Sequence, residues 1–133
     1  MLKTDITHLL GKEIILFDRS SYSCAVYGTI IGEEQTAPDD TALVVSWTRV
    51  EVSDEFLNAR HQVNTFNSET NEKYIMDALK HFNNYQRLIR RYHFKNPYEY
   101  FTFGFVGTKY GEHVKRLAEK RQEESIKYYN NLK

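Results

Sequence analysis

The chain has 133 residues, of which 41% are hydrophobic and 27% charged, and these values fit a globular domain and exclude a disordered chain. No segment approaches about 18 consecutive apolar residues, which argues against a membrane-spanning helix. The formal net charge is zero, whereas nucleic-acid-binding proteins usually carry a strong positive excess. We expect a single domain over residues 1–133, with a strand-rich part at 12–66 and a helical part at 68–132.

A single cysteine, Cys24, limits the redox chemistry of the chain. It has no partner for an internal disulfide, which favours a reducing compartment. Residues 1–5 lack the apolar run of a signal peptide. We therefore expect a cytoplasmic protein, in which Cys24 is a small core residue rather than a nucleophile.

Acidic and basic residues are unevenly distributed along the chain. Residues 1–69 contain 5 Lys and Arg against 11 Asp and Glu, a balance of −6, and residues 70–133 contain 13 against 7, a balance of +6. Two explanations remain open. Either the halves attract each other, within the domain or between copies, or helices simply collect Lys and Arg while turns collect Asp.

The first predicted elements are a helical turn and two strands. Residues 4–10 favour a short helical turn that is closed by Gly11. Residues 13–17 are β-branched and aromatic and predict a buried strand. Residues 23–31 alternate in period two and predict a second strand, in which Gly28 marks a bulge or a tight bend.

The next segment predicts a loop and two more strands. Residues 32–41 combine carboxylates with Pro38 and are typical of an acidic, exposed loop. Residues 42–52 predict a third strand, on which Trp47 is either a core anchor or an interface hot spot. A fourth strand is expected between residues 60 and 66. Short strands joined by brief turns predict a small, curled antiparallel sheet.

Hydrophobic periodicity changes near residue 70 from two to steps of three and four. Over residues 70–93 the apolar side chains share one face, which predicts a long helix that ends before Pro97. We expect this face to lie across the sheet, and the arginines to occupy the last turns, where the helix dipole favours cations. The apolar face contains Ile75, Leu79, Phe82 and Ile89, and the arginines are Arg87, Arg90 and Arg91.

The C-terminal part predicts an aromatic strand and a second helix. Residues 98–106 are rich in Tyr and Phe and favour a strand. Residues 112–132 are rich in helix formers and carry oppositely charged pairs four residues apart. The fold class is therefore α+β, a small curled antiparallel sheet followed by two C-terminal helices.

Residues 11–16, 28–32 and 43–47 have a regular spacing of strands and turns. In this rhythm, over about a third of the chain, the sequence resembles small SH3-like barrels. The resemblance implies a curled barrel and a binding module.

The segment 103–106, Phe-Gly-Phe-Val, overlaps the core of the signature with which RNA-recognition motifs stack bases. Three positions depart from that signature, namely Phe101, Thr102 and Thr108. The order of predicted strands and helices also differs from that fold. We interpret the segment as a buried aromatic strand between two helices.

No catalytic or metal-binding motif is evident in the sequence. It contains no Gly-rich phosphate loop, no Gly-x-Ser-x-Gly elbow, and no HExxH or CxxC pattern. The five His residues are scattered, and one cysteine leaves no thiolate set for zinc. We expect no enzymatic activity, no cofactor and no metal site.

The leading hypothesis is a non-catalytic binding or regulatory protein that acts through protein–protein interaction and can self-associate through its acidic and basic halves. Aromatic and arginine side chains dominate the energetics of such interfaces. The expected partner-binding residues are Trp47, Arg87, Arg91, Tyr98 and Tyr100.

Two alternative functions remain open. Basic stripes on the two predicted helices could hold single-stranded RNA or DNA by its phosphates. Aromatic side chains could instead wall a pocket for a small molecule or nucleotide. The basic residues are Lys80, Arg87, Arg91, Arg116 and Lys120, and the aromatic residues are Tyr27, Phe101, Phe103 and Phe105.

Overall fold

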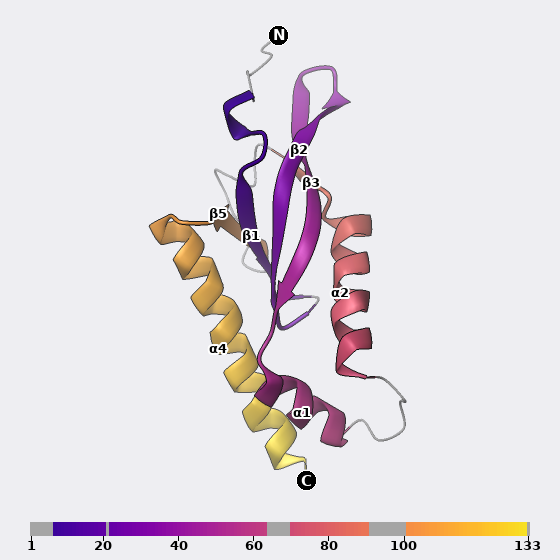
Figure 1. Cartoon of the computed structure of the whole chain (residues 1–133), viewed down its shortest axis with the longest axis vertical. Coiled ribbons are helices and arrows are strands. Elements are labelled where there is room, and N and C mark those ends of the chain that lie inside the picture. The colour runs from indigo at the N-terminus through magenta and orange to yellow at the C-terminus, as the bar shows by residue number, and fades with distance from the viewer. Residues whose placement is uncertain (1–6, 21, 64–69, 91–100, 133) are drawn as a thin grey trace.

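The fold is a five-stranded antiparallel sheet with helices on both faces (Figure 1). The computed structural model describes residues 7–20, 22–63, 70–90 and 101–132. The strand order is β4-β3-β2-β1-β5, so the outer strands do not meet. The α+β class is confirmed, whereas the sheet is open and does not close into an SH3-like barrel. The elements are a 3-10 helix (Thr7–Leu9), β1 (Glu13–Asp18), β2 (Ala25–Ala37), β3 (Asp40–Glu51), α1 (Asp54–Val63), α2 (Asn71–Tyr85), β4 (Leu88–Arg90), β5 (Phe101–Phe105) and α4 (Lys109–Asn131).

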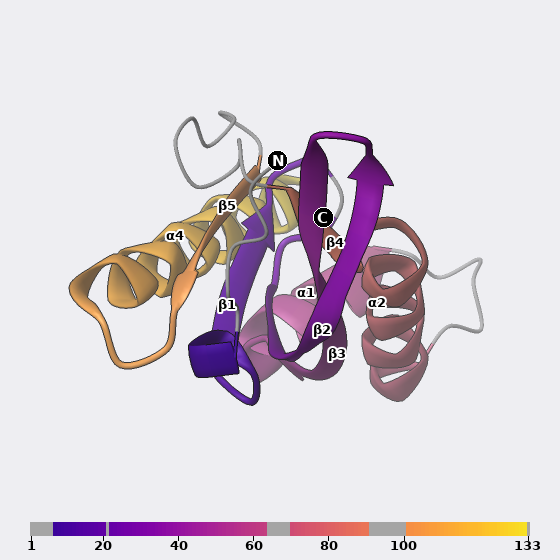
Figure 2. The same ribbon diagram turned by 90° about the horizontal axis from the view of Figure 1, so that it is seen from above.

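Alternate residues of the central strands form two cores, one on each face of the sheet. Helix α2 covers one face and α4 the other, as Figure 1 and Figure 2 both show. Because successive strand residues point to opposite faces, Ile14 and Ile15 are buried in different cores. The α2-side core contains Ile14, Leu16, Val26, Ile30, Leu43, Val45, Trp47, Phe82, Ile89 and Phe103, and the α4-side core contains Ile15, Phe17, Ala25, Tyr27, Val114 and Ala118.

Trp47 connects strand β3 to helix α2. Its indole Nε1 donates to the carbonyl oxygen of Gln86 (3.1 Å), and its main-chain N–H donates to Oδ1 of Asn83 (2.9 Å). On β2, Gly28 leaves room for the indole, because a Cβ there would lie 2.5 Å from Cε3 of Trp47. The register of β2 against β3 shifts between Tyr27 and Gly28, where Thr48 of β3 is the extra residue, so the irregularity expected at Gly28 is present but the bulged strand is β3.

The strand predicted between residues 60 and 66 is wrong, because residues 54–63 form helix α1. Ser53 caps this helix, since its hydroxyl accepts the N–H of Phe56 (3.1 Å). Two acidic residues in the first turn favour the helix through its dipole. The change from strands to helices therefore comes at residue 54 rather than at residue 70.

Helix α1 closes one end of the molecule, where it meets both other helices. Its Phe56 packs against Tyr74 of α2, with ring centroids 5.8 Å apart, and against Tyr129 of α4 at 6.0 Å. Phe56, Leu57 and Tyr74 form a third buried cluster. The open end of the two-faced sheet is thereby covered by apolar contacts.

Helix α2 ends at Tyr85, so the prediction of one helix over residues 70–93 is wrong. Gln86 leaves helical geometry with a φ of −120°, and residues 88–90 pair with β3 as strand β4. Ile89 is buried as expected, but from a strand. The outer edge of β3 decides this outcome, because it offers main-chain hydrogen bonds that a longer helix would leave unmade.

The acidic segment 32–41 was predicted as a loop and is instead most of a β-hairpin. Strand β2 continues to Ala37 and β3 begins at Asp40. Only Pro38 and Asp39 form the turn between them. The exposure of the acidic side chains was predicted correctly, whereas their strand conformation was not.

The C-terminal predictions agree with the structure in the described residues. Residues 101–105 form β5, which pairs with β1, and a long helix follows. Helix α4 begins at Lys109, three residues before the predicted start, because the Thr108 hydroxyl caps it by accepting the N–H of Gly111 (3.1 Å).

Candidate functional site

The structure describes two of the predicted partner-binding residues, Trp47 and Arg87, and only Arg87 lies on the surface. Trp47 is only 2% exposed, so it is a core anchor, and we no longer place it at an interface. Arg87 lies just beyond helix α2 and is exposed, with Nη1 3.3 Å from Oε2 of Glu34. Arg91, Tyr98 and Tyr100 lie outside the described residues.

The predicted nucleic-acid-binding residues lie on two sides of the molecule. Lys80 is exposed on α2, while Arg116 and Lys120 are exposed on α4. Since these helices cover opposite faces of the sheet (Figure 2), their basic stripes do not line one groove. The prediction that both stripes grip one phosphate backbone is therefore not supported by the geometry.

The predicted aromatic pocket is also divided by the sheet. Phe103 belongs to the α2-side core and Phe105 packs against it, whereas Tyr27 belongs to the α4-side core. The side chain of Phe101 lies outside the described residues. The prediction of a pocket walled by Tyr27 together with Phe103 is therefore wrong, because the two rings lie on opposite faces of the sheet.

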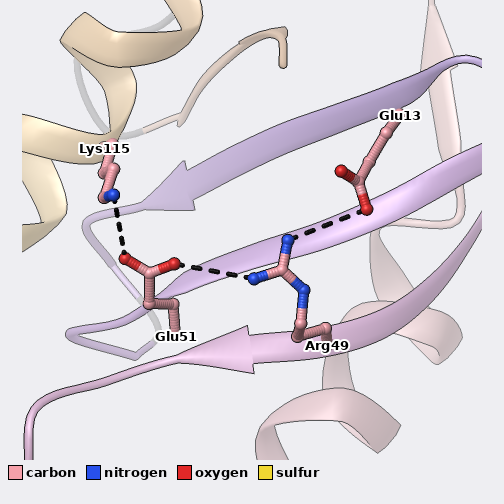
Figure 3. Close-up of polar contacts among 4 residues, drawn as sticks. All are labelled: Glu13, Arg49, Glu51 and Lys115. Carbon is pink, nitrogen blue, oxygen red and sulfur yellow. Dashed lines mark ion pairs between the residues drawn. The ribbon is translucent and has the colours of Figure 1, made fainter. Parts of the chain in front are cut away.

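A network of charged side chains crosses the sheet toward helix α4 (Figure 3). Arg49 of β3 lies 3.8 Å from Glu13 of β1 and 3.6 Å from Oε2 of Glu51. The other oxygen of Glu51, Oε1, lies 3.5 Å from Nζ of Lys115 on α4. These side chains are partly exposed, so each pair contributes at most about 1 kcal/mol to stability. The network therefore adds little to the free energy of unfolding, but it fixes the positions of these charges.

Tyr27 lies beneath this charged network. The guanidinium of Arg49 stacks 3.8 Å above the ring centroid of Tyr27. Burial, followed by the neighbouring Glu51 carboxylate, raises the pKa of Tyr27 to about 12. The hydroxyl therefore remains protonated at neutral pH.

A pocket of about 340 Å³ opens beside Glu51, between the end of β3 and helix α4. Gln122 lines it and is only 5% exposed. Its Oε1 accepts the main-chain N–H of Ser53 (2.9 Å), so the pocket and the cap of α1 share this side chain. The lining residues are Ala25, Glu51, Val52, Ser53, Lys115, Ala118, Glu119 and Gln122.

Sequence reasoning did not identify this pocket. One signal was present, because Lys115, Ala118 and Gln122 follow helical spacing on the face that Val114 buries. A glutamine on such an apolar stripe indicates a buried amide that needs partners. The approach of Ser53, far away in sequence, could not be read from this pattern.

The second candidate surface is the side of β2 that faces β1, along the part of β2 that extends beyond β1. We call this side the outer edge of β2. The last hydrogen bonds on this side join the Gly11 N–H to the Ile30 carbonyl (2.9 Å) and the Ile30 N–H to the Lys12 carbonyl (3.0 Å). From Ile31 to Ala37, no other strand of the described chain pairs with this side of β2 (Figure 1). Among the described residues, the hairpin therefore presents a strand edge without a neighbour.

Cys24 is buried, and burial raises the pKa of its thiol to about 12. The thiol remains protonated and unreactive at neutral pH. We expect iodoacetamide to leave the folded protein unmodified under conditions that alkylate it fully in denaturant, as measured by mass spectrometry. Rapid alkylation of the folded protein would contradict this prediction.

Three further observations concern membrane-spanning helices, metal binding and similarity to known proteins. No helix in the described ranges is both long and apolar enough to cross a bilayer. Within the same ranges, no three His, Cys, Asp or Glu side chains gather as a metal site would require. No protein family, curated protein or solved structure was found to match the chain.

Proposed function

We propose that this protein is a non-catalytic interaction protein that binds a basic, extended segment of a partner protein along the outer edge of β2. The observation that carries the proposal is the open edge from Ile31 to Ala37. An open strand edge presents main-chain N–H and C=O groups, and a partner strand can satisfy them by extending the sheet. Such binding needs no catalytic group.

Charge selects the kind of partner for this edge. The hairpin carries four carboxylates, and one of them, on Glu34, is paired with Arg87. Complementary charge steers association and rejects unsuitable partners. A Lys- or Arg-rich segment is therefore favoured over an acidic one, and two hairpins of this protein repel each other edge to edge. The carboxylates belong to Glu33, Glu34, Asp39 and Asp40.

Acidic side chains on an open edge also have a simpler role, since they protect a sheet against aggregation. The position and exposure of Ile31 favour a binding role for this edge in addition to protection against aggregation. The register steps from the pair Ile30–Val45 to the pair Gly32–Val44, so Ile31 is an extra residue of β2. Its side chain is 60% exposed, which offers an apolar contact at the start of the acidic edge.

Reversing the charge of two hairpin residues tests this proposal. The variant Glu33→Lys/Glu34→Lys should lose the partner that wild type captures from its own cell extract, with recovery falling by about tenfold or more, because like charges now meet. Recovery is measured by quantitative mass spectrometry. Cross-linking should then locate a Lys- or Arg-rich segment of the partner at the hairpin.

Helix α4 provides a matched control for this variant. Glu123 and Glu124 are also adjacent and exposed, and Glu124 makes a similar weak ion pair, with Arg121 at 3.9 Å. The variant Glu123→Lys/Glu124→Lys changes the net charge equally and should retain the partner. Equal loss in both variants, or no loss in either, would overturn the proposed binding edge.

A further inference from the structure

The pocket beside Glu51 is a second, independent site. It lies at the end of β3 where Glu51 leads into α1, whereas the acidic hairpin lies at the other end of β3 (Figure 1). Its volume of about 340 Å³ falls in the range of small-molecule pockets. Ala25, Val52 and Ala118 give it apolar walls.

Gln122 points to a ligand in this pocket. Its Oε1 is occupied by the Ser53 N–H, and this bond fixes the orientation of the amide, because only the oxygen can accept. Nε2 then carries two donors, and no acceptor in the described part of the chain receives them. These two donors are therefore available to an acceptor group of a ligand in the pocket.

Two charged side chains of α4 complete the pocket. Lys115 and Glu119 are four residues apart and both line it, but Lys115 is directed to Glu51 rather than to Glu119. Glu51 already makes ion pairs with Arg49 and Lys115. Glu119 has no such partner among the described residues. The pocket therefore offers the ammonium group of Lys115, which is shared with Glu51, and the carboxylate of Glu119, which has no ion-pair partner in the described part of the chain.

We propose that this pocket binds a small zwitterion of the α-amino acid class. The ligand carboxylate would accept from Nζ of Lys115 and Nε2 of Gln122, and the ligand ammonium would pair with Glu119. The α-substituent would rest on the apolar walls. Charge-assisted hydrogen bonds at both ends explain why one molecule must carry both groups.

Calorimetric titration of the full chain with free amino acids tests the ligand class. At least one of the standard amino acids should bind saturably and raise the melting temperature. The same compound without its amine, or without its carboxylate, should bind about tenfold more weakly, as expected for one lost charge-assisted contact. Failure of every amino acid to bind at millimolar concentration would overturn the proposal.

Substitutions then locate the binding at this pocket. Lys115→Gln and Gln122→Glu should each weaken binding by about tenfold or more. The Gln122→Glu variant keeps an oxygen that accepts the Ser53 N–H. The matched control is Lys127→Gln, an exposed lysine of the same helix that does not line the pocket. If Gln122→Glu fails to fold, Lys115→Gln decides, because its side chain is partly exposed and its loss should leave the fold intact.

Unchanged affinity in Lys115→Gln would place the binding elsewhere and reject this site. The result is independent of the hairpin, because neither Glu33 nor Glu34 lines the pocket. A hairpin variant that loses its protein partner should therefore still bind the amino acid.

Discussion

Replacing Phe82 by alanine is expected to lower the free energy of unfolding by about 3–5 kcal/mol, the cost of deleting a buried aromatic ring. Phe82 is 0% exposed and belongs to the α2-side core. Its ring lies 6.4 Å from that of Trp47 in an edge-on arrangement. Loss of the ring leaves a cavity where helix α2 meets β3, and urea denaturation measures the cost.

Tyr85 provides a control on the same helix. It is also aromatic and lies one turn later, but it is 74% exposed. Tyr85→Ala should change the free energy of unfolding by at most about 0.5 kcal/mol. Similar losses in both variants would mean that α2 does not pack through Phe82 as described.

Replacing Gly111 by alanine should cost about 1–3 kcal/mol, which is typical of overpacking at a rigid contact. A Cβ at this position would lie 2.1 Å from the main-chain oxygen of Phe105, so β5 and the first turn of α4 would have to separate. The intrinsic preference of alanine for helices, about 1 kcal/mol, offsets only part of this strain. Thermal or urea unfolding measures the difference.

Gly32 is the matched glycine for this experiment. A Cβ at Gly32 meets nothing within 4 Å, and its backbone needs no left-handed φ. Gly32→Ala should therefore be neutral or stabilise the protein by up to about 1 kcal/mol, because alanine has less freedom in the unfolded chain. A neutral Gly111→Ala variant would contradict the close approach of α4 to β5.

Local patterns were enough to predict part of the fold. The strand at 13–17 and a bulge or bend at Gly28 were predicted from residue type and alternation. The strand is present, and the register shifts next to Gly28. Residues 71–85 lie within the helix that periodicity predicted over 70–93, and the last helix was predicted from its helix-forming residues and charged pairs. These signals are local, so they survive without knowledge of neighbours.

Two predictions were wrong because the residues involved are compatible with more than one local structure. Ser53 and the acidic residues after it are typical of a turn, yet they also cap a helix. Phe56 and Leu57 are buried only when α2 and α4 pack against them. Ile89 continues a helical spacing, yet the open edge of β3 draws it into a strand. Tertiary contacts override local preference in both cases.

The partner-binding candidates show the same limit. Arg87 was chosen for its chemistry, and its position at the base of the hairpin depends on where α2 ends. Trp47 was chosen for its size, and the sequence does not tell whether such a ring faces a partner or a core. Gln122 and Ser53 were not chosen at all, because only folding brings them together.

By itself, the sequence determined the α+β class, the central strands and the helical character of the C-terminal part, since each rests on the periodicity of neighbouring residues. Tertiary structure alone decided which face each helix covers, where β2 loses its neighbour, and how Glu51, Lys115 and Gln122 surround one pocket. The physical reason is that surfaces and pockets are made by residues distant in the chain. Their meeting depends on packing and on the satisfaction of main-chain hydrogen bonds across the whole molecule.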